Sequence, residues 1–164
     1  MKNKKRGFTL VELIVAMSIL AVVAGAVYSV YMFSLRSYSK GAEQSGIQYD
    51  VRRAGAFITS ETRNSRKLEL IDLSEVKEND SEYSYIYVDN SRLYCRRPGK
   101  SPVEMTGEIF SEAFQGFTII KLENGSNLLA FSLEAEKFKI ESQVALNNIK
   151  GMEETRGEAI KYKK

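Results

Sequence analysis

The chain contains no histidine and only one cysteine, Cys95, among its 164 residues. Without histidine, imidazole-based triads, histidine-ligated metal sites and imidazole acid–base chemistry are excluded. Cys95 has no second cysteine for an internal disulfide and no companion ligands for zinc. Enzymes without histidine exist, so these absences lower the expectation of catalysis without abolishing it. We expect no enzyme activity, no cofactor and no metal.

Formal charge is absent from residues 13 to 33, which read LIVAMSILAVVAGAVYSVYMF. After Arg36 the sequence becomes polar and charge-rich, and its apolar residues occur in short runs. This change in composition predicts a membrane anchor followed by one modest soluble domain.

The net charge of +3 is small and lies mainly at the two ends of the chain. The basic residues concerned are Lys2, Lys4, Lys5, Arg6, Lys161, Lys163 and Lys164. A nucleic-acid surface needs many basic residues on one face with aromatic residues among them. We therefore infer no direct binding of nucleic acid.

The apolar segment is long enough to cross a bilayer, since about 20 helical residues span roughly 30 Å of hydrocarbon. Four basic residues precede it, whereas Arg36 and Lys40 follow it more sparsely, so the N-terminus is expected in the cytoplasm and the C-terminal domain outside. A secretory signal peptide would have a shorter apolar core and a small-residue cleavage site after it, which Ser34-Leu35-Arg36 does not offer. A plain signal anchor explains the length and the orientation but leaves Glu12 unexplained.

Glu12 places a carboxylate at the start of this apolar helix, on the fifth residue after Gly7. A charge at the centre of a membrane helix costs about 2.5–3.5 kcal/mol, and less near one end, so such a residue is a functional-site candidate. Cleavage between Gly7 and Phe8 would create a positive α-amino group one turn away. If identical helices stack with an axial stagger, Glu12 can meet the Phe8 amine of a neighbouring subunit. The alternative is an interfacial Glu12 that faces lipid headgroups.

The basic leader, Gly7, the run Phe8-Thr9-Leu10-Val11-Glu12 and the apolar helix after it resemble the N-terminal signature of type IV prepilins and type II secretion pseudopilins. The resemblance covers about the first fifth of the chain. It implies that a membrane-embedded prepilin peptidase cleaves after Gly7 and methylates the amine of Phe8. It also implies that Glu12 supports subunit registration during assembly.

The apolar segment departs from many pilins because it contains no helix-kinking proline. Gly25 is its only residue of such low helix propensity, about 1 kcal/mol below alanine. Unwinding of the helix would have to begin there. A small residue that allows close helix packing is the favoured interpretation of Gly25.

Helical periodicity continues beyond the anchor, where apolar residues recur at three- and four-residue spacing from Ile47 to Ile58. We expect one helix from about residue 8 to about residue 65, loosened at Gly41 or Gly46. Its second half carries an apolar stripe that another element must cover.

Strand signals follow the helix. Residues 83–88 and 92–96 predict one hairpin, and residues 117–122 and 128–133 predict a second around Asn124-Gly125. Residues 138–146 alternate as a further strand, and residues 68–73 fit either a strand or the helix end. The expected fold class is α+β, with a long N-terminal helix packed on an antiparallel β-sheet, which agrees with the pilin fold that the resemblance implies.

Four segments are expected: a cleaved leader (1–7), a transmembrane and filament-core helix (8–35), an exported pilin-like domain (36–149) and a tail (150–164) that is mobile or weakly helical. Residues 48–58 and 144–148 look similar to minor pilins and pseudopilins of the J/W type, which are low-copy tip subunits. Asn147 stands where arginine is more usual.

For several other residues, a structural role is favoured over a role in binding or catalysis. The acidic residues Glu75, Glu78, Asp80 and Glu82 lack the spacing of a calcium loop, so a solvated loop is favoured. For Tyr83, Tyr85 and Tyr87, which alternate along one strand, packing is favoured over a ligand platform. Cys95 is expected to be buried or idle, and Ser101 and Ser111 have no base to activate them.

The resemblance implies the membrane, prepilin peptidase, other pilin subunits and the assembly platform with its ATPase as partners. Two functions stay open: a filament subunit, in a type IV pilus or in a secretion or DNA-uptake pseudopilus, and a membrane-tethered extracellular binding module that uses a pilin-like anchor. Genes for a peptidase, an assembly ATPase and a platform protein nearby would favour the filament.

Overall fold

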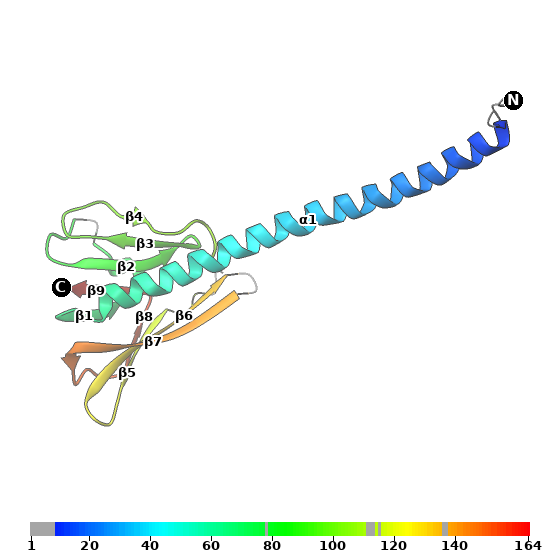
Figure 1. Ribbon diagram of the computed structural model, residues 1–164. Helices are drawn as coiled ribbons and strands as arrows, with labels where there is room; N and C mark the ends of the chain where they lie inside the picture. Colours follow the sequence, from blue (N-terminus) through cyan, green and yellow to red (C-terminus); the bar gives the residue numbers. More distant parts are fainter. Residues whose placement is uncertain (1–8, 78, 111–113, 115, 136–137) are drawn as a thin grey trace, which may run out of the picture. The chain divides into compact units, whose positions relative to one another are not determined.

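The computed structural model describes residues 9–77, 79–110, 114, 116–135 and 138–164. The chain divides into two compact units, residues 1–44 and 45–164, and helix α1 (Leu10–Thr62) contributes to both (Figure 1). The helix passes through Gly41 and Gly46 without a break, so the expected loosening there is not observed. Its observed bounds lie within three residues of the expected ones.

The second unit contains two antiparallel sheets and the last part of α1. The first sheet has the strand order β1-β9-β2-β3-β4. Its strands are β1 (Lys67–Ile71), β2 (Ser84–Asp89), β3 (Arg92–Arg96), β4 (Val103–Glu104) and β9 (Ala159–Lys163). A short 3-10 helix, η1 (Leu73–Glu75), follows β1.

The second sheet has the strand order β7-β6-β5-β8. Its strands are β5 (Phe117–Lys121), β6 (Ser126–Ala135), β7 (Phe138–Lys150) and β8 (Thr155–Gly157). Every second residue of β6 is buried, which is the alternation of a strand with one face on the core. The fold class is therefore α+β and pilin-like, as predicted, with two sheets where one was expected.

The core lies between the C-terminal part of α1 and the inner faces of both sheets. Val51, Ala54 and Ile58 are fully buried on the helix, which confirms the apolar stripe. Gly55 lies beside them, and a Cβ there would be 3.8 Å from the Phe131 ring, an ordinary packing distance. The first sheet contributes Leu68, Ile86, Leu93 and Ile160, and the second contributes Phe117, Ile119, Leu129, Phe131, Leu133 and Val144.

Both predicted hairpins are present, and in each of them two consecutive strands pair antiparallel. The turn between β2 and β3 consists of Asn90 and Ser91, whose φ angles are 45° and 61°, as the two-residue turn of a twisted hairpin requires. Gly125 turns the second hairpin with a φ of 78°. The ambiguous segment after the helix is a strand, β1, and the segment 138–146 begins β7 as predicted.

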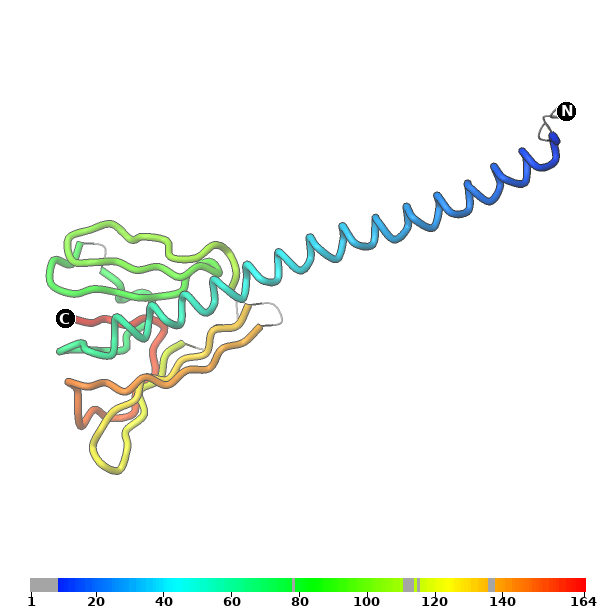
Figure 2. Tube along the Cα trace, in the orientation of Figure 1, coloured from blue at the N-terminus to red at the C-terminus, as the bar shows by residue number. Residues whose placement is uncertain are grey.

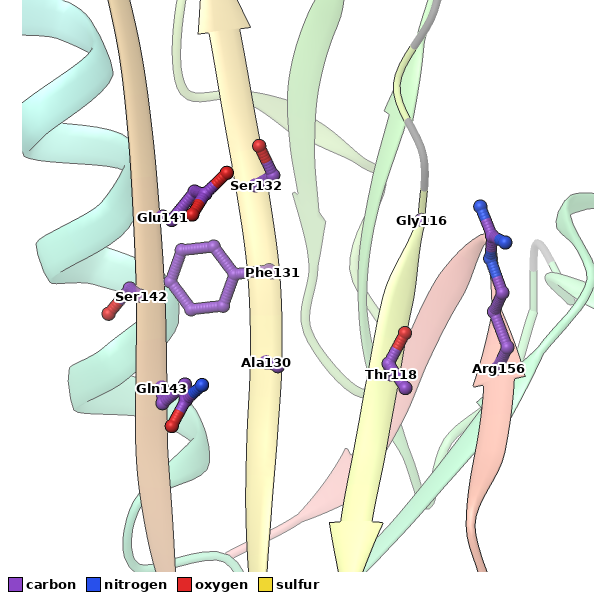
Figure 3. Close-up of a pocket in the computed structure, with 9 residues that line it drawn as sticks. All are labelled: Gly116, Thr118, Ala130, Phe131, Ser132, Glu141, Ser142, Gln143 and Arg156. Carbon is purple, nitrogen blue, oxygen red and sulfur yellow. The ribbon is translucent and has the colours of Figure 1, made fainter.

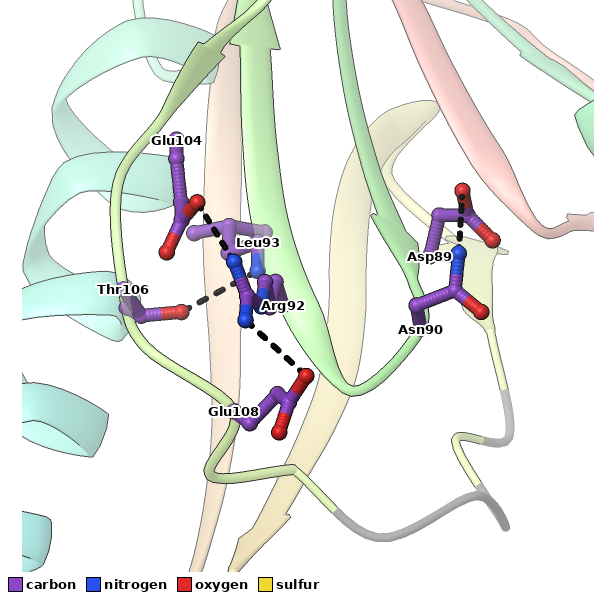
Figure 4. A network of polar contacts seen from close by, with 7 residues as sticks. All are labelled: Asp89, Asn90, Arg92, Leu93, Glu104, Thr106 and Glu108. Atoms are coloured by element: carbon purple, nitrogen blue, oxygen red, sulfur yellow. Dashed lines mark hydrogen bonds and ion pairs between the residues drawn. The ribbon is translucent and has the colours of Figure 1, made fainter.

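A polar network fastens the segment after β3 to that strand (Figure 4). Arg92 donates to Glu104 and Glu108, at 2.9 Å in each case. The amide of Leu93 donates to the hydroxyl of Thr106 at 3.0 Å. These contacts hold β4 and the residues after it in place.

The prediction of a mobile or weakly helical tail is wrong for residues 155–163. They form β8, which pairs with β5, and β9, which pairs with both β1 and β2. In Figure 2 the red C-terminal segment lies alongside β1. Ile160 and Tyr162 of β9 are almost fully buried. Burial of these apolar side chains stabilises the strand although the segment is highly charged.

Candidate functional site

The N-terminus of α1 is capped by reciprocal hydrogen bonds between Thr9 and Glu12. The Glu12 carboxylate accepts from the Thr9 amide at 2.9 Å and from the Thr9 hydroxyl at 2.8 Å. The Glu12 amide in turn donates to the Thr9 hydroxyl oxygen at 3.2 Å. This is a capping box, in which Thr9 is the N-cap and Glu12 occupies the third helical position.

The capping box gives Glu12 a role within its own chain. The first four amides of a helix have no intrahelical partner, and leaving them unsatisfied in hydrocarbon is costly. The sequence interpretation considered only a partner on another subunit or a lipid headgroup, and it missed Thr9. The pattern Thr-x-x-Glu before an apolar run was the available signal. Gly7 and Phe8, the predicted cleavage and methylation residues, lie outside the described residues.

The rest of the first unit presents an apolar surface. Apart from Met32, which is half-buried, its large apolar side chains from Leu10 to Phe33 are between 51% and 74% exposed, so no described residue of the unit covers them. By length and composition α1 can cross a membrane. Such a surface needs either lipid or other apolar helices around it.

A family model described as a prokaryotic N-terminal methylation motif matches residues 2–28. This chain carries a type IV pilin-like N-terminal signal. The match includes the basic leader, Gly7, Phe8, Glu12 and most of the apolar segment. Comparison with curated proteins and with solved structures finds no match.

The pilin-like signal and the apolar helix together support membrane anchoring. A pilin-type methylation motif is typical of structural proteins and implies processing by prepilin peptidase. The matched segment ends at Tyr28, so the match does not extend to the second unit, for which the structure shows an α+β, pilin-like fold class.

Two of the acidic residues after β1, Asp80 and Glu82, have structural partners in the second unit. Asp80 accepts from the Tyr85 hydroxyl at 2.6 Å and from the Glu82 and Tyr83 amides. The Glu82 carboxylate binds Lys163 at 2.8 Å. Glu75 is exposed, and Glu78 lies outside the described residues. Across the part of the chain that the structure describes, no three acidic or cysteine side chains form a metal-binding group.

The tyrosines have packing roles. Tyr85 is buried, Tyr87 stacks on Tyr94 with ring centroids 5.5 Å apart, and the Lys161 ammonium lies 4.5 Å from the Tyr83 ring centroid. Tyr83 lies just before β2 rather than within it. Each of the three tyrosines thus makes a packing contact, as expected.

The remaining candidates are a cysteine and two serines. Cys95 is buried as expected, and burial raises the pKa of its thiol, which disfavours the reactive thiolate. Ser101 is exposed, and Ser111 lies outside the described residues.

Proposed function

We propose that this chain is a minor structural subunit of a type IV pilus or a related pseudopilus, assembled through its N-terminal helix. The observation that carries the proposal is the match of residues 2–28 to the methylation motif. The exposed apolar helix supports it, because a filament core of parallel helices would cover this surface once the subunit leaves the bilayer.

Processing follows from the same motif. The prepilin peptidase cuts between Gly7 and Phe8 and methylates the new amine of Phe8. A glycine before the scissile bond lets the peptidase approach the backbone closely. The leader stays in the cytoplasm, and the second unit is exported.

Assembly requires further partners. Other subunits pack against α1, the platform protein and its ATPase drive insertion into the filament, and Glu12 pairs with the Phe8 ammonium of a neighbouring subunit. The minor role rests on the likeness of residues 48–58 and 144–148 to J/W-type subunits.

Mass spectrometry of the mature N-terminus in the native host tests the proposal. We expect a chain that begins with an N-methylated Phe8. Gly7→Leu should abolish cleavage because the bulky side chain blocks the peptidase, whereas the matched variant Gly25→Ala should be cleaved normally. A mature chain that begins at Met1, or after Ser34, would contradict the proposal.

A further inference from the structure

Strand β7 forms a long outer edge of the second sheet. The outermost strands of the two sheets are β1, β4, β7 and β8, with five, two, 13 and three residues respectively. Short edge strands offer little backbone to another chain, and proline protects many longer ones, but β7 contains no proline. In Figure 3 the part of β7 that carries Glu141, Ser142 and Gln143 has β6 on one side and α1 near the other.

Alternate residues of β7 direct their backbone groups to this outer edge. The Leu122 amide donates to the Ser126 carbonyl at 2.8 Å, so these two residues form the last hydrogen-bonded pair of the hairpin between β5 and β6. Such pairs recur at every second residue, so even-numbered residues of β6 bond β5 and odd-numbered residues bond β7. The β7 partners of those odd-numbered residues are even-numbered up to Leu146. The backbone groups that point away from β6 are therefore those of Lys139, Glu141, Gln143 and Ala145.

Contacts with α1 mark the two ends of this row. The Asn147 amide donates to the Arg63 carbonyl at 3.0 Å, as an outward-directed amide of β7 would. At the other end, the Arg52 guanidinium lies 5.7 Å from the ring centroid of Phe138. Between these contacts, the outward backbone groups of residues 139–145 have no hydrogen-bond partner among the described residues. We call this row of residues 139–145 the open edge.

The side of α1 next to the open edge carries two arginines. Arg52 and Arg63 are eleven residues apart, which is about three helical turns, so they share one side of the helix about 16 Å apart. Ala56 and Thr59 lie between them on that side, and their side chains are small. Both arginines are exposed, and within the part of the chain that the structure describes neither of them forms an ion pair.

These features together select one class of ligand. Unpaired backbone groups in a row bind another extended backbone by strand addition. Phe138 and Ile140 on the inner face of β7 are only half-buried, so apolar side chains of an added strand would cover them. Carboxylates at its two ends would meet Arg52 and Arg63. A seven-residue strand spans about 20 Å, and its inner side chains would then be acidic, apolar, apolar and acidic in order.

We propose that the open edge binds an extended acidic segment of a partner protein. The segment adds to β7 as an antiparallel strand, the pairing that every described strand pair uses, and its two carboxylates bind Arg52 and Arg63. This site does not rest on assembly through the N-terminal helix, because all its residues belong to the second unit.

Fluorescence polarisation of a labelled heptapeptide, ETVTVTE, with the full chain in phosphocholine nanodiscs tests the proposal. We expect it to bind at least tenfold more tightly than the neutral peptide QTVTVTQ, because only its carboxylates form charge-assisted hydrogen bonds. Its threonines would lie opposite the residues of the open edge, so N-methylation of the three threonine amides should abolish binding. N-methylation of the two valine amides, which would point away from β7, should change the affinity by less than threefold.

Variants of the protein test the two parts of the site separately. The double variant Arg52→Gln, Arg63→Gln should reduce the affinity for ETVTVTE to that for QTVTVTQ. The control Arg53→Gln, about 100° around the helix from Arg52, should change it by less than threefold. Gln143→Pro removes an outward amide without breaking a bond to β6 and should weaken binding at least tenfold, while circular dichroism shows the fold retained. Three outcomes would overturn the proposal: no binding of ETVTVTE, equal effects of the two N-methylation patterns, or equal binding to the double variant and the wild type.

Discussion

At Gly157 the backbone of β8 meets the end of β1 without room for a side chain. A Cβ at this position would lie 2.8 Å from the amide nitrogen of Ile71 and 2.9 Å from its carbonyl oxygen. Across the strand pair, Gly116 is equally confined, because a Cβ there would lie 2.5 Å from the carbonyl oxygen of Gly157. Gly157 therefore lets β8 of the second sheet approach β1 of the first, and Gly116 lets the residue before β5 approach β8.

Gly157→Ala should therefore destabilise the second unit by about 1–3 kcal/mol, the usual cost of forcing extra atoms into a packed site. The neighbouring atoms belong to the backbone and cannot move as a side chain can. Urea unfolding followed by circular dichroism measures the change. Gly107→Ala is the matched control, since a Cβ there has no neighbour within 4 Å. Equal stability of the two variants would contradict the interpretation.

Asp80 and Tyr85 link the loop after β1 to the first sheet. The hydrogen bond from the Tyr85 hydroxyl, together with those from the Glu82 and Tyr83 amides, lowers the pKa of Asp80 to about 2. Burial and the hydrogen bond to Asp80 raise the pKa of Tyr85 to about 12. The ionised carboxylate and the neutral phenol are thus the forms that stabilise the fold.

The pH dependence of stability follows from these two pKa values. Asp80 stabilises the fold fully above the ordinary pKa of 3.8, and this contribution disappears as the pH falls towards about 2. The Tyr85 contribution is complete below pH 10 and disappears as the pH rises towards about 12. Urea unfolding across this range should show a flatter acid limb for Asp80→Asn and a flatter alkaline limb for Tyr85→Phe. Wild-type pH profiles in both variants would contradict the assignment.

At the scale of the element, β9 connects strands that are far apart in the sequence. It pairs with β1 on one side and with β2 on the other, and it buries Ile160 and Tyr162. Burying a large apolar side chain contributes about 1.5–3 kcal/mol, and a domain is stable by only about 5–15 kcal/mol. The strand therefore accounts for a large share of the stability of the second unit.

Ending the chain after Glu158 should abolish cooperative folding of the second unit. Limited proteolysis should then degrade residues 63–158 rapidly, whereas the intact chain should leave a resistant fragment. Lys161→Gln is the control, because it keeps the strand and removes only the contacts of the ammonium group with Glu69 and with the Tyr83 ring, each worth about 1 kcal/mol or less. A truncated chain as resistant as the intact one would show that the sheet does not depend on β9.

Local sequence patterns predicted the elements whose signals are local. The α1 stripe, both hairpins and the start of β7 have periodic apolar residues and turn residues between them. The division into two sheets and the position of β9 depend on pairing between segments about 90 residues apart, which no local pattern specifies. In β9 the alternation Ile160-Lys161-Tyr162-Lys163 was present, but it is short and lies in a strongly charged segment.

For the candidate functional residues too, the sequence predicted what depends on neighbouring residues and missed what depends on distant ones. Gly7, Phe8 and Glu12 could be selected from the sequence because the motif is contiguous, and the family match covers all three. The Thr9 cap is equally local and could have been recognised from its spacing. The contact of Glu82 with Lys163 could not be predicted, because only folding brings β9 beside the loop before β2.

At the scale of the whole molecule, Glu12 has one partner in the structure and one proposed partner. Within the chain it caps α1 through Thr9. In a filament it would pair with the Phe8 ammonium of a neighbouring subunit, and losing one member of a buried ion pair costs about 3–5 kcal/mol. Membrane insertion and cleavage need only the helix and the leader, whereas incorporation into a filament would need the ion pair.

Glu12→Gln separates the two roles because glutamine preserves a capping box but carries no charge. If the ion pair acts in assembly, Glu12→Gln and Glu12→Ala should both be cleaved and membrane-inserted, yet both should be depleted from sheared surface filaments at least tenfold. Glu12→Asp should be intermediate, since its shorter side chain cannot hold the same contact. Thr9→Val, which removes the cap but leaves the carboxylate, should be incorporated better than either. Quantitative immunoblotting of membrane and filament fractions measures the incorporation of all four variants. Normal incorporation of Glu12→Gln would show that the ion pair is not needed and that Glu12 acts by capping the helix.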